Sequence, residues 1–269
     1  MPKFLAAAIQ LNSQPNLDDN LEKIYLWVMS ASEAGAQFIG LPENFAFMGN
    51  EKERLKQAET IAENVEESLI RWAKEFNVTI LGGGYPVPAG DGKVYNRAII
   101  AEPSGVISAA YDKIHLFDVE LSAKESYRES EMVEPGKKAV TIRLKKPEIS
   151  VGLSICYDVR FPELYRELAL QGSELLCVPA AFTKPTGKAH WETLLRARAI
   201  ENSAFVIAPA QTGKHGSKRE TYGHSMIIDP WGVILTNAGS EPGMALAEID
   251  TSTLAEVRKK LPSLKHRVL

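Results

Sequence analysis

Three side chains with the chemistry of nucleophilic catalysis each follow an apolar run in this sequence. Cys156 ends the β-branched run 149–155, and a helix is expected to begin at Pro162. A thiol at such a strand-to-helix junction is a candidate nucleophile, because the beginning of a helix favours negative charge. Glu43 and Lys113 also follow short apolar runs. Residues at the ends of strands are presented on loops, so we expect these three to converge on one pocket.

The strands and helices that must position these residues are expected to alternate along the chain. Strands are expected at 4–11, 38–41, 78–81, 95–101, 106–111, 140–144, 149–155, 175–179, 205–210, 225–229, 233–235 and 245–249. Helices are expected between the cap Asn16 and Gly35, within 51–76, and at 162–170, 190–201 and 252–260. Residues 113–135 and 211–223 are polar and are expected to be loops. Strands of mixed order with helices between them predict an α/β fold in which helices cover the sheets.

The amino-acid composition limits the class of protein to which this chain can belong. The chain has 269 residues, of which 45% are hydrophobic and 24% are charged, and its formal net charge is -3. These values predict one α/β domain over residues 1–269 and give no reason to expect nucleic acid or a membrane as partner. The short apolar start is expected to be a strand and not a signal peptide. Two cysteines favour a reducing compartment, the cytoplasm. No metal-ligand spacing is present, so we expect neither metal nor cofactor.

The motifs around these residues resemble those of the nitrilase superfamily of carbon–nitrogen hydrolases. They read LPEN at Glu43, YDKIHL at Lys113 and CYDVRFPE from Cys156 onward, and the resemblance continues through residues 189–201 and 222–232. Three motifs in family order, with two further blocks, make the resemblance specific. It implies a four-layer α-β-β-α sandwich of two mixed sheets, and a homodimer or higher homo-oligomer. A tail from about residue 262 is expected to dock on a partner subunit.

The resemblance implies a role for each member of the set. Cys156 would attack an amide carbonyl carbon, while Glu43 would take the thiol proton and return it to the leaving amine. Lys113 and the backbone N–H of Tyr157 would stabilise the oxyanion, where one donor is worth roughly 3–4 kcal/mol. Water activated by Glu43 would then hydrolyse the thioester. A catalytically silent binding protein is the alternative from another class, and the intact set weighs against it.

A second glutamate is also implied between the lysine and the cysteine. Glu129 lies 16 residues after Lys113 and matches best, and its expected work is to hold Lys113. Glu120 and Glu125 remain alternatives, because spacing alone does not choose among three nearby carboxylates.

Finer details resemble the branch of the superfamily that hydrolyses deaminated glutathione. They are the CYDVRFPE block, residues 208–213, the basic stretch 214–219 and residues 222–226. The implied substrate is a 2-oxo acid amide, and the products would be 2-oxoglutarate and cysteinylglycine. The ω-amidase branch, which acts on 2-oxoglutaramate, is the nearest alternative, followed by other amide, nitrile or carbamoyl hydrolases.

Several residues are candidates for binding this substrate. Arg160 could bind a carboxylate bidentately, or could pair with an acidic neighbour to hold the turn after the cysteine. Thr183 could donate to the same carboxylate, and Phe47 and Tyr157 are expected to line the cleft. The basic stretch 214–219 is either a solvated face or a recruiter of anionic substrate.

Three further features are expected to be structural. Cys177 lies in the middle of an expected strand and should be a core residue. His224 should hold a structural hydrogen bond, because no glycines flank Cys156 as a nucleophile elbow with a Cys-His-Asp triad would require. The glycines at 82–84 match no phosphate loop and should permit close approach of another segment.

Overall fold

Two six-stranded mixed sheets form the centre of the molecule. The computed structural model describes residues 3–268 apart from 123–124 and 217–218. The first sheet has the order β16 (Gly243–Asp250), β1 (Lys3–Gln10), β2 (Ala36–Gly40), β3 (Thr79–Gly90), β4 (Lys93–Ala101), β5 (Ile107–Asp112). The second has the order β15 (Ile234–Asn237), β14 (Met226–Ile228), β11 (Phe205–Ala208), β10 (Leu175–Cys177), β9 (Glu148–Leu153), β8 (Val140–Lys145).

The two sheets repeat one pattern of strand directions. From β16 to β5 the neighbouring pairs are antiparallel, parallel, parallel, antiparallel and antiparallel. From β8 to β15 the same succession occurs. Each sheet therefore has a parallel centre, made of β1, β2 and β3 in one sheet and β9, β10 and β11 in the other. Parallel strands need crossover helices, and these helices form the outer layers.

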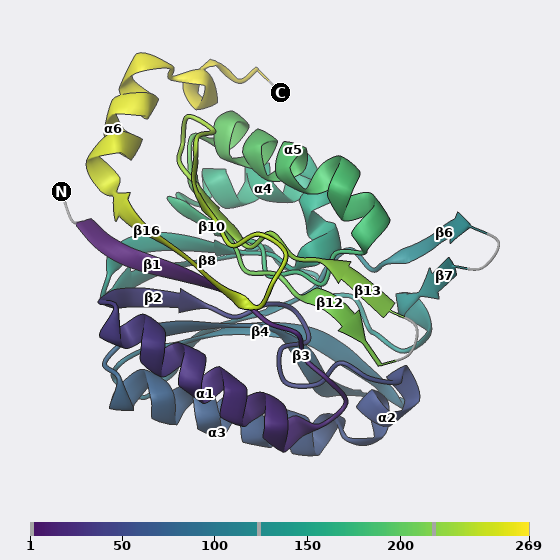
Figure 1. Ribbon diagram of the computed structural model, residues 1–269. Coiled ribbons are helices and arrows are strands. Elements are labelled where there is room, and N and C mark those ends of the chain that lie inside the picture. Colours follow the sequence, from purple (N-terminus) through teal and green to yellow (C-terminus); the bar gives the residue numbers. More distant parts are fainter. Residues whose placement is uncertain (1–2, 123–124, 217–218, 269) are drawn as a thin grey trace.

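Helices cover the outer face of each sheet (Figure 1). The first sheet carries α1 (Leu17–Glu33) and α3 (Ala58–Glu75), and the second carries α4 (Pro162–Leu170) and α5 (Lys184–Asn202). Two more helices, α2 (Glu51–Lys56) and α6 (Thr251–Lys260), lie beside these layers. The expected four-layer α-β-β-α sandwich of two mixed sheets is confirmed. Within the described residues, no helix is long and apolar enough to span a membrane.

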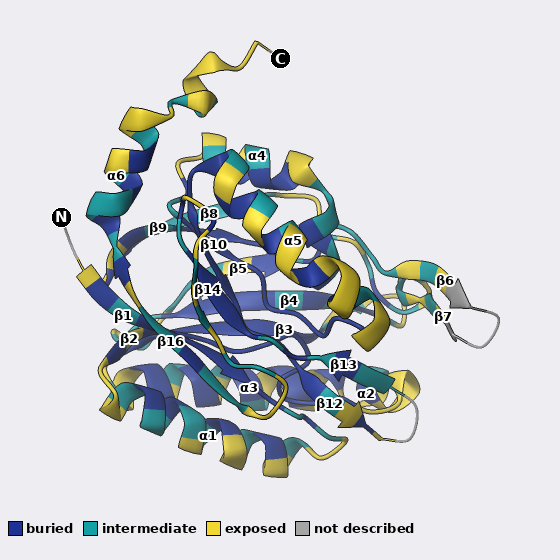
Figure 2. Ribbon diagram, turned by 45° about the horizontal axis from the view of Figure 1, so that its top comes forward, coloured by how far each residue is buried: buried dark blue, intermediate teal, exposed yellow. Residues whose placement is uncertain are grey.

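Alternation along the strands divides the core into two parts. Ala6, Ala8 and Phe38 belong to the cluster that lies between the sheets and continues under α4 and α5, whereas Ile9 and Ile39 belong to the cluster under α1 and α3. Successive side chains of a strand point to opposite faces, so one strand supplies both clusters. Figure 2 shows that the central strands of the sheets are buried, whereas the outer faces of the helices are exposed.

Local signals in the sequence place most helix ends. The Asn16 side chain accepts a hydrogen bond from Asp19 N at 3.2 Å and caps α1. Helix α4 has the predicted bounds and begins at Pro162, where the missing N–H costs no helical bond. Helix α5 begins at Lys184, six residues before its expected start. Residues 51–76 form the two helices α2 and α3.

Two segments expected to be loops contain hairpins instead. Residues 113–135 hold β6 (Asp118–Ser122), β7 (Glu125–Arg128) and the short 3₁₀ helix η1 (Glu129–Glu131). Residues 211–223 hold β12 (Thr212–His215) and β13 (Arg219–Tyr222). Both hairpins are rich in polar residues because they stand outside the two large sheets, so hydrophobic alternation did not reveal them.

The glycines at 82–84 lie inside β3 and let other segments approach. A Cβ on Gly83 would collide with the carbonyl oxygen of Pro42, and one on Gly84 would collide with the side chain of Asn96. This confirms the expected close approach, and it brings Asn96 against the segment that carries Glu43.

Candidate active site

The three predicted residues meet where the carboxyl ends of the parallel strands from both sheets face each other. Glu43 follows β2 and Lys113 follows β5, both in the first sheet. Cys156 follows β9 of the second sheet and begins the 3₁₀ helix η2 (Cys156–Arg160). Ala181, which follows β10, donates its N–H to Glu43 Oε2 at 3.0 Å and so joins the two sheets at this point.

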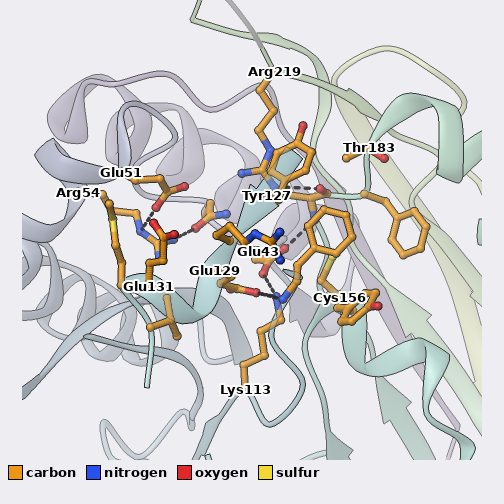
Figure 3. Close-up of a pocket in the computed structure, with 18 of the residues that line it drawn as sticks. Glu43, Glu51, Arg54, Lys113, Tyr127, Glu129, Glu131, Cys156, Thr183 and Arg219 are labelled. Carbon is orange, nitrogen blue, oxygen red and sulfur yellow. Dashed lines mark hydrogen bonds and ion pairs between the residues drawn. The ribbon is translucent and has the colours of Figure 1, made fainter. Parts of the chain in front are cut away.

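A buried cluster of charges surrounds Lys113 (Figure 3). Lys113 Nζ lies 3.1 Å from Glu43 Oε1 and 2.8 Å from Glu129 Oε2. The exposed fractions of the lysine and Glu43 side chains are only 2% and 3%, so water screens this pair little. Glu129 Oε2 also accepts the N–H of Phe117 at 2.7 Å. Lys113 is thereby held between two carboxylates.

Asn96, on β4, connects the two glutamates. Its Nδ2 donates to Glu43 Oε1 at 2.9 Å and to Glu129 Oε1 at 3.3 Å. Its backbone oxygen accepts the N–H of Lys113 at 2.9 Å. A neutral amide between two anions adds hydrogen bonds without adding charge. Asn96 therefore fixes the relative positions of all three charged groups.

The chain turns sharply at Cys156. This residue has φ of +47°, a left-handed conformation that costs of order 1–3 kcal/mol in a residue with a side chain. Its N–H donates to the carbonyl oxygen of Pro179 at 2.9 Å, and the N–H of Ile155 donates to Asp158 Oδ2 at 2.8 Å. Hydrogen bonds on both sides of the turn thus hold the thiol in place.

Asp158 ties this turn to the segment that carries Lys113. Its carboxylate is buried and accepts the hydroxyl of Tyr111 at 2.7 Å and the N–H of His115 at 3.0 Å. The His115 ring also lies against it, with Nδ1 at 2.7 Å from Oδ1. Tyr111 and His115 flank Lys113 by two residues on either side, so Asp158 sets the distance between the nucleophile and the cation.

The charged groups around the cluster shift the pKa values of Glu43, Cys156 and Lys113 and so determine which of them are protonated. Burial raises the pKa of Glu43, but the charges of Lys113 and Arg219, with hydrogen bonds from Cys156 and Lys113, outweigh this and hold it below the usual value. Burial and the charge of Glu43 raise the pKa of the Cys156 thiol well above its usual range, against the opposing effect of Lys113. Burial lowers the pKa of Lys113, but Glu129 and Glu43 raise it further. At neutral pH Cys156 is therefore a thiol, Glu43 a carboxylate and Lys113 an ammonium.

A cavity of about 350 Å³ opens over this cluster. Its walls include the catalytic candidates and four aromatic rings, from Phe117, Tyr127, Tyr157 and Phe182. Such a volume and a mainly apolar wall with a few polar groups suit a small organic ligand. Among the described residues, no group of three or more His, Cys, Asp or Glu is placed to hold a metal ion.

The sequence profile of the carbon-nitrogen hydrolase family matches residues 5–259. The chain belongs to this family. A protein of Synechocystis named deaminated glutathione amidase is 54% identical over an aligned length of 270, and the alignment covers 100% of this chain and 99% of that protein. An omega-amidase of Xenopus tropicalis is 36% identical over 99% of this chain and 96% of its own length.

A solved structure shares the fold of this carbon-nitrogen hydrolase. The crystal structure of the Caenorhabditis elegans nitrilase and fragile histidine triad fusion protein superposes with a TM-score of 0.93 at 39% identity. The match covers 99% of this chain and 65% of that longer chain. The nitrilase-superfamily resemblance is confirmed, and with its amidase relatives the chain is an enzyme that hydrolyses amides.

The contacts of the other predicted site residues show which of them lie at the charged cluster or in the cavity wall. Of the candidate second glutamates, Glu129 contacts Lys113, whereas Glu120 pairs with Arg128 at 2.6 Å away from the cluster. The side chain of Glu125 lies outside the described part of the chain. Thr183 lines the cavity and hydrogen-bonds Thr186.

Two of the expected substrate contacts are not in the cavity wall. Phe47 is 2% exposed and packs in the core under α1 and α3, so its expected position in the cleft is wrong. Arg160 lies beside the cavity, where its guanidinium sits over the ring of Phe182 at 5.2 Å and reaches His190 Nδ1 at 3.3 Å. No acidic partner of Arg160 lies among the described residues, so neither prediction for it is supported.

Other residues of the site were not identified from the sequence. Asn96 is a buried polar residue in an apolar strand, and Asp158 stands two residues after the nucleophile; both features were visible but no role was assigned. Arg54 and Arg219 line the cavity, and only Arg219 belonged to the predicted basic stretch. Cys177 is fully buried in the core, as predicted.

His224 has structural contacts, as expected. Its Nδ1 lies 3.2 Å from Asn237 Oδ1, and its carbonyl oxygen accepts the indole N–H of Trp191 at 3.0 Å. It is not part of the cavity wall.

Proposed function

We propose that this enzyme hydrolyses the amide of deaminated glutathione and releases 2-oxoglutarate and cysteinylglycine. The observation that carries the proposal is the 54% identity, along the whole chain, to the Synechocystis deaminated glutathione amidase. The cluster of Glu43, Lys113 and Glu129 beside Cys156 supports it, because this set can perform each step of amide hydrolysis without a cofactor.

Cys156 is the proposed nucleophile and Glu43 the proposed general base. Because the thiol rests protonated and Glu43 rests charged, the proton passes from sulfur to Glu43 as sulfur attacks the carbonyl carbon. Glu43 then gives this proton to the departing amine, and the carbon–nitrogen bond breaks to leave a thioester. Water loses a proton to Glu43, attacks the thioester and releases the acid, and the thiol regains its proton.

Lys113 and the backbone N–H of Tyr157 are the proposed oxyanion donors. Lys113 is already oriented by Glu43 and Glu129, so no reorganisation is needed when negative charge develops on the substrate oxygen. Glu129 is the proposed fourth catalytic residue, and its support is the pair of hydrogen bonds with Lys113.

A second candidate substrate is 2-oxoglutaramate, which shares the 2-oxo acyl half. The relative of Xenopus tropicalis named omega-amidase is the observation in its favour. The two substrates differ only in the leaving group, so the ratio of their kcat/KM values measures which one the transition state fits better.

The test is a substrate panel with two cysteine variants. We expect wild type to release cysteinylglycine from deaminated glutathione, and Cys156→Ala to abolish turnover with an unchanged circular dichroism spectrum. Mass spectrometry should find the acyl group on Cys156. Cys177→Ala is the matched control and should retain turnover, because Cys177 lies in the core. If wild type releases neither cysteinylglycine nor, from 2-oxoglutaramate, ammonia, the proposed function fails.

We further propose that two copies of the chain pair through the layer of α4 and α5. Exposed apolar side chains on this side support the pairing; they are Leu170, Ile200, Trp231 and Val233. The segment after Pro262 remains a candidate to dock on the partner. Light scattering of the purified protein tests the mass. The free thiols of Cys156 and Cys177 fit a reducing compartment, the cytoplasm.

A further inference from the structure

One cationic side chain in the described part of the cavity wall lacks an ion pair. Among the described residues, four cations line the cavity, and three have carboxylate partners: Arg54 pairs with Glu51, Lys113 with two glutamates and Arg128 with Glu120. Arg219 has no ion pair with any residue that the structure describes. Its neighbour in sequence, Glu220, pairs with Lys184 instead, at 2.8 Å.

The guanidinium of Arg219 makes few hydrogen bonds within the described chain. Its Nε is buried and has no hydrogen-bond partner within the described chain. Its Nη2 makes one long bond of 3.3 Å to the carbonyl oxygen of Ala181. A buried donor without an acceptor is unfavourable in the free protein, and a ligand that supplies the acceptor removes this cost.

The position of Arg219 is set from two sides. The ring of Tyr127 lies 5.8 Å from its guanidinium carbon, and Figure 3 shows the two side chains together above Glu43. Ala181, which accepts from Arg219, donates its own N–H to Glu43 Oε2 and interacts with the Cys156 thiol. A single residue therefore separates the guanidinium from the base and the nucleophile.

We propose that Arg219 binds the carboxylate of the acyl half of the substrate, so that the enzyme selects short amides with an anionic acyl chain. A guanidinium matches a carboxylate with two parallel hydrogen bonds, and Tyr127 holds its plane. Because the anchor lies so near Cys156, it holds the acyl chain both before attack and in the thioester. This inference rests on the proposed function, and it names Arg219 where the sequence suggested Arg160.

The test compares substrates with and without that carboxylate. For Arg219→Ala we expect kcat/KM to fall roughly 30- to 1000-fold on both deaminated glutathione and 2-oxoglutaramate. On butyramide, which lacks the carboxylate, the same variant should change kcat/KM less than about threefold. Arg219→Lys keeps the charge but not the two parallel N–H donors of the guanidinium, so its kcat/KM should lie between those of Arg219→Ala and wild type. Arg143→Ala, which removes an arginine outside the cavity wall that is paired with Glu148 and Glu174, is the control and should be near wild type.

Three results would overturn the inference. Equal losses on butyramide and on the acids would mean that Arg219 acts on Glu43 or on the fold. A loss on deaminated glutathione alone would assign Arg219 to the carboxylate of the leaving group. Equal binding of 2-oxoglutarate by wild type and Arg219→Ala in calorimetry would exclude the contact. This last readout needs no turnover, so it judges Arg219 even if wild type hydrolyses neither acid and the proposed function fails.

Discussion

At the scale of single residues, the resting position of one proton defines the chemistry. The pKa of Glu43 is lowered and that of Cys156 is raised, so the proton rests on sulfur. Cysteine enzymes that rely on a thiolate–cation pair lower the thiol pKa instead. Here Lys113 forms ion pairs with Glu43 and Glu129, and its charge does not bring the thiol pKa below the usual value. The general base Glu43 must therefore remove the thiol proton in the same step as the sulfur attacks.

This arrangement predicts the pH dependence of the enzyme. Activity needs charged Glu43, and its lowered pKa means that kcat/KM should fall only below the usual glutamate value near 4.5. Because the pKa of Cys156 is raised, kcat/KM should not change near pH 8.5, where an ordinary cysteine loses its proton. We therefore expect a flat profile from about pH 5 to about pH 8.

Two measurements check this profile. Steady-state kinetics should show the plateau, and thiolate absorbance near 240 nm should not rise below about pH 8 in wild type relative to Cys156→Ala. An acid limb between about pH 6 and pH 7, or thiolate at neutral pH, would contradict the assigned protonation states.

At the scale of elements, the turn from β9 to η2 is clamped by Asp158. The same carboxylate holds Ile155 N on the nucleophile segment and Tyr111 and His115 on the lysine segment. The His115 ring stacks on Phe161 with centroids 3.7 Å apart, so aromatic packing supports the same junction. The junction sets the separation between nucleophile and oxyanion cation.

Asp158→Asn should therefore reduce kcat more than it changes KM. The asparagine amide would place N–H donors against groups that themselves donate hydrogen bonds, and this would loosen the turn. We expect kcat to fall roughly 100-fold, because a small displacement of the reacting groups is costly. The rate of Cys156 alkylation by iodoacetamide should change as well, a readout that general destabilisation would not move in the folded protein.

A matched carboxylate exists away from the site. Asp229 accepts the N–H groups of Trp231 and Val233 in the turn between β14 and β15. Asp229→Asn makes the same chemical change there and should leave kcat within about twofold, because such turn bonds contribute only about 1 kcal/mol to stability. Equal kinetics of both variants would remove Asp158 from the positioning role.

At the scale of the whole molecule, each sheet supplies half of the site. Glu43 and Lys113 come from the first sheet, and Cys156 and Ala181 come from the second. The layer between the sheets, where Phe38 is fully buried, holds these halves together. Activity should therefore depend on the packing of the two sheets as a unit.

Phe38→Ala tests this dependence. Removing a buried phenylalanine should lower the free energy of unfolding by about 3–5 kcal/mol, measured by urea denaturation. Activity and tertiary circular dichroism should be lost at the same urea concentration. Val106→Ala, at a side chain that is 52% exposed, is the control and should stay within about 0.5 kcal/mol of wild type. Loss of activity well before global unfolding would show that the halves separate independently.

Features that depend on local order along the chain could be predicted from the sequence alone. Hydrophobic alternation and caps such as Asn16 define most strands and helices, because these signals act within a few residues. Cys156, Glu43 and Lys113 were found because each stands directly after a strand, and the motifs around them identify the family.

Which of the candidate side chains face the cavity could not be predicted from the sequence and is known from the packing of the two sheets. Glu129 was separated from Glu120 by its contact with Lys113, and Arg219 replaced Arg160 in the wall because a hairpin expected to be a loop carries it there. Phe47 lies in the core under α1 and α3 and not in the cleft. The physical reason is that strand ends are local, whereas the direction of a side chain across two packed sheets depends on residues far away in the sequence.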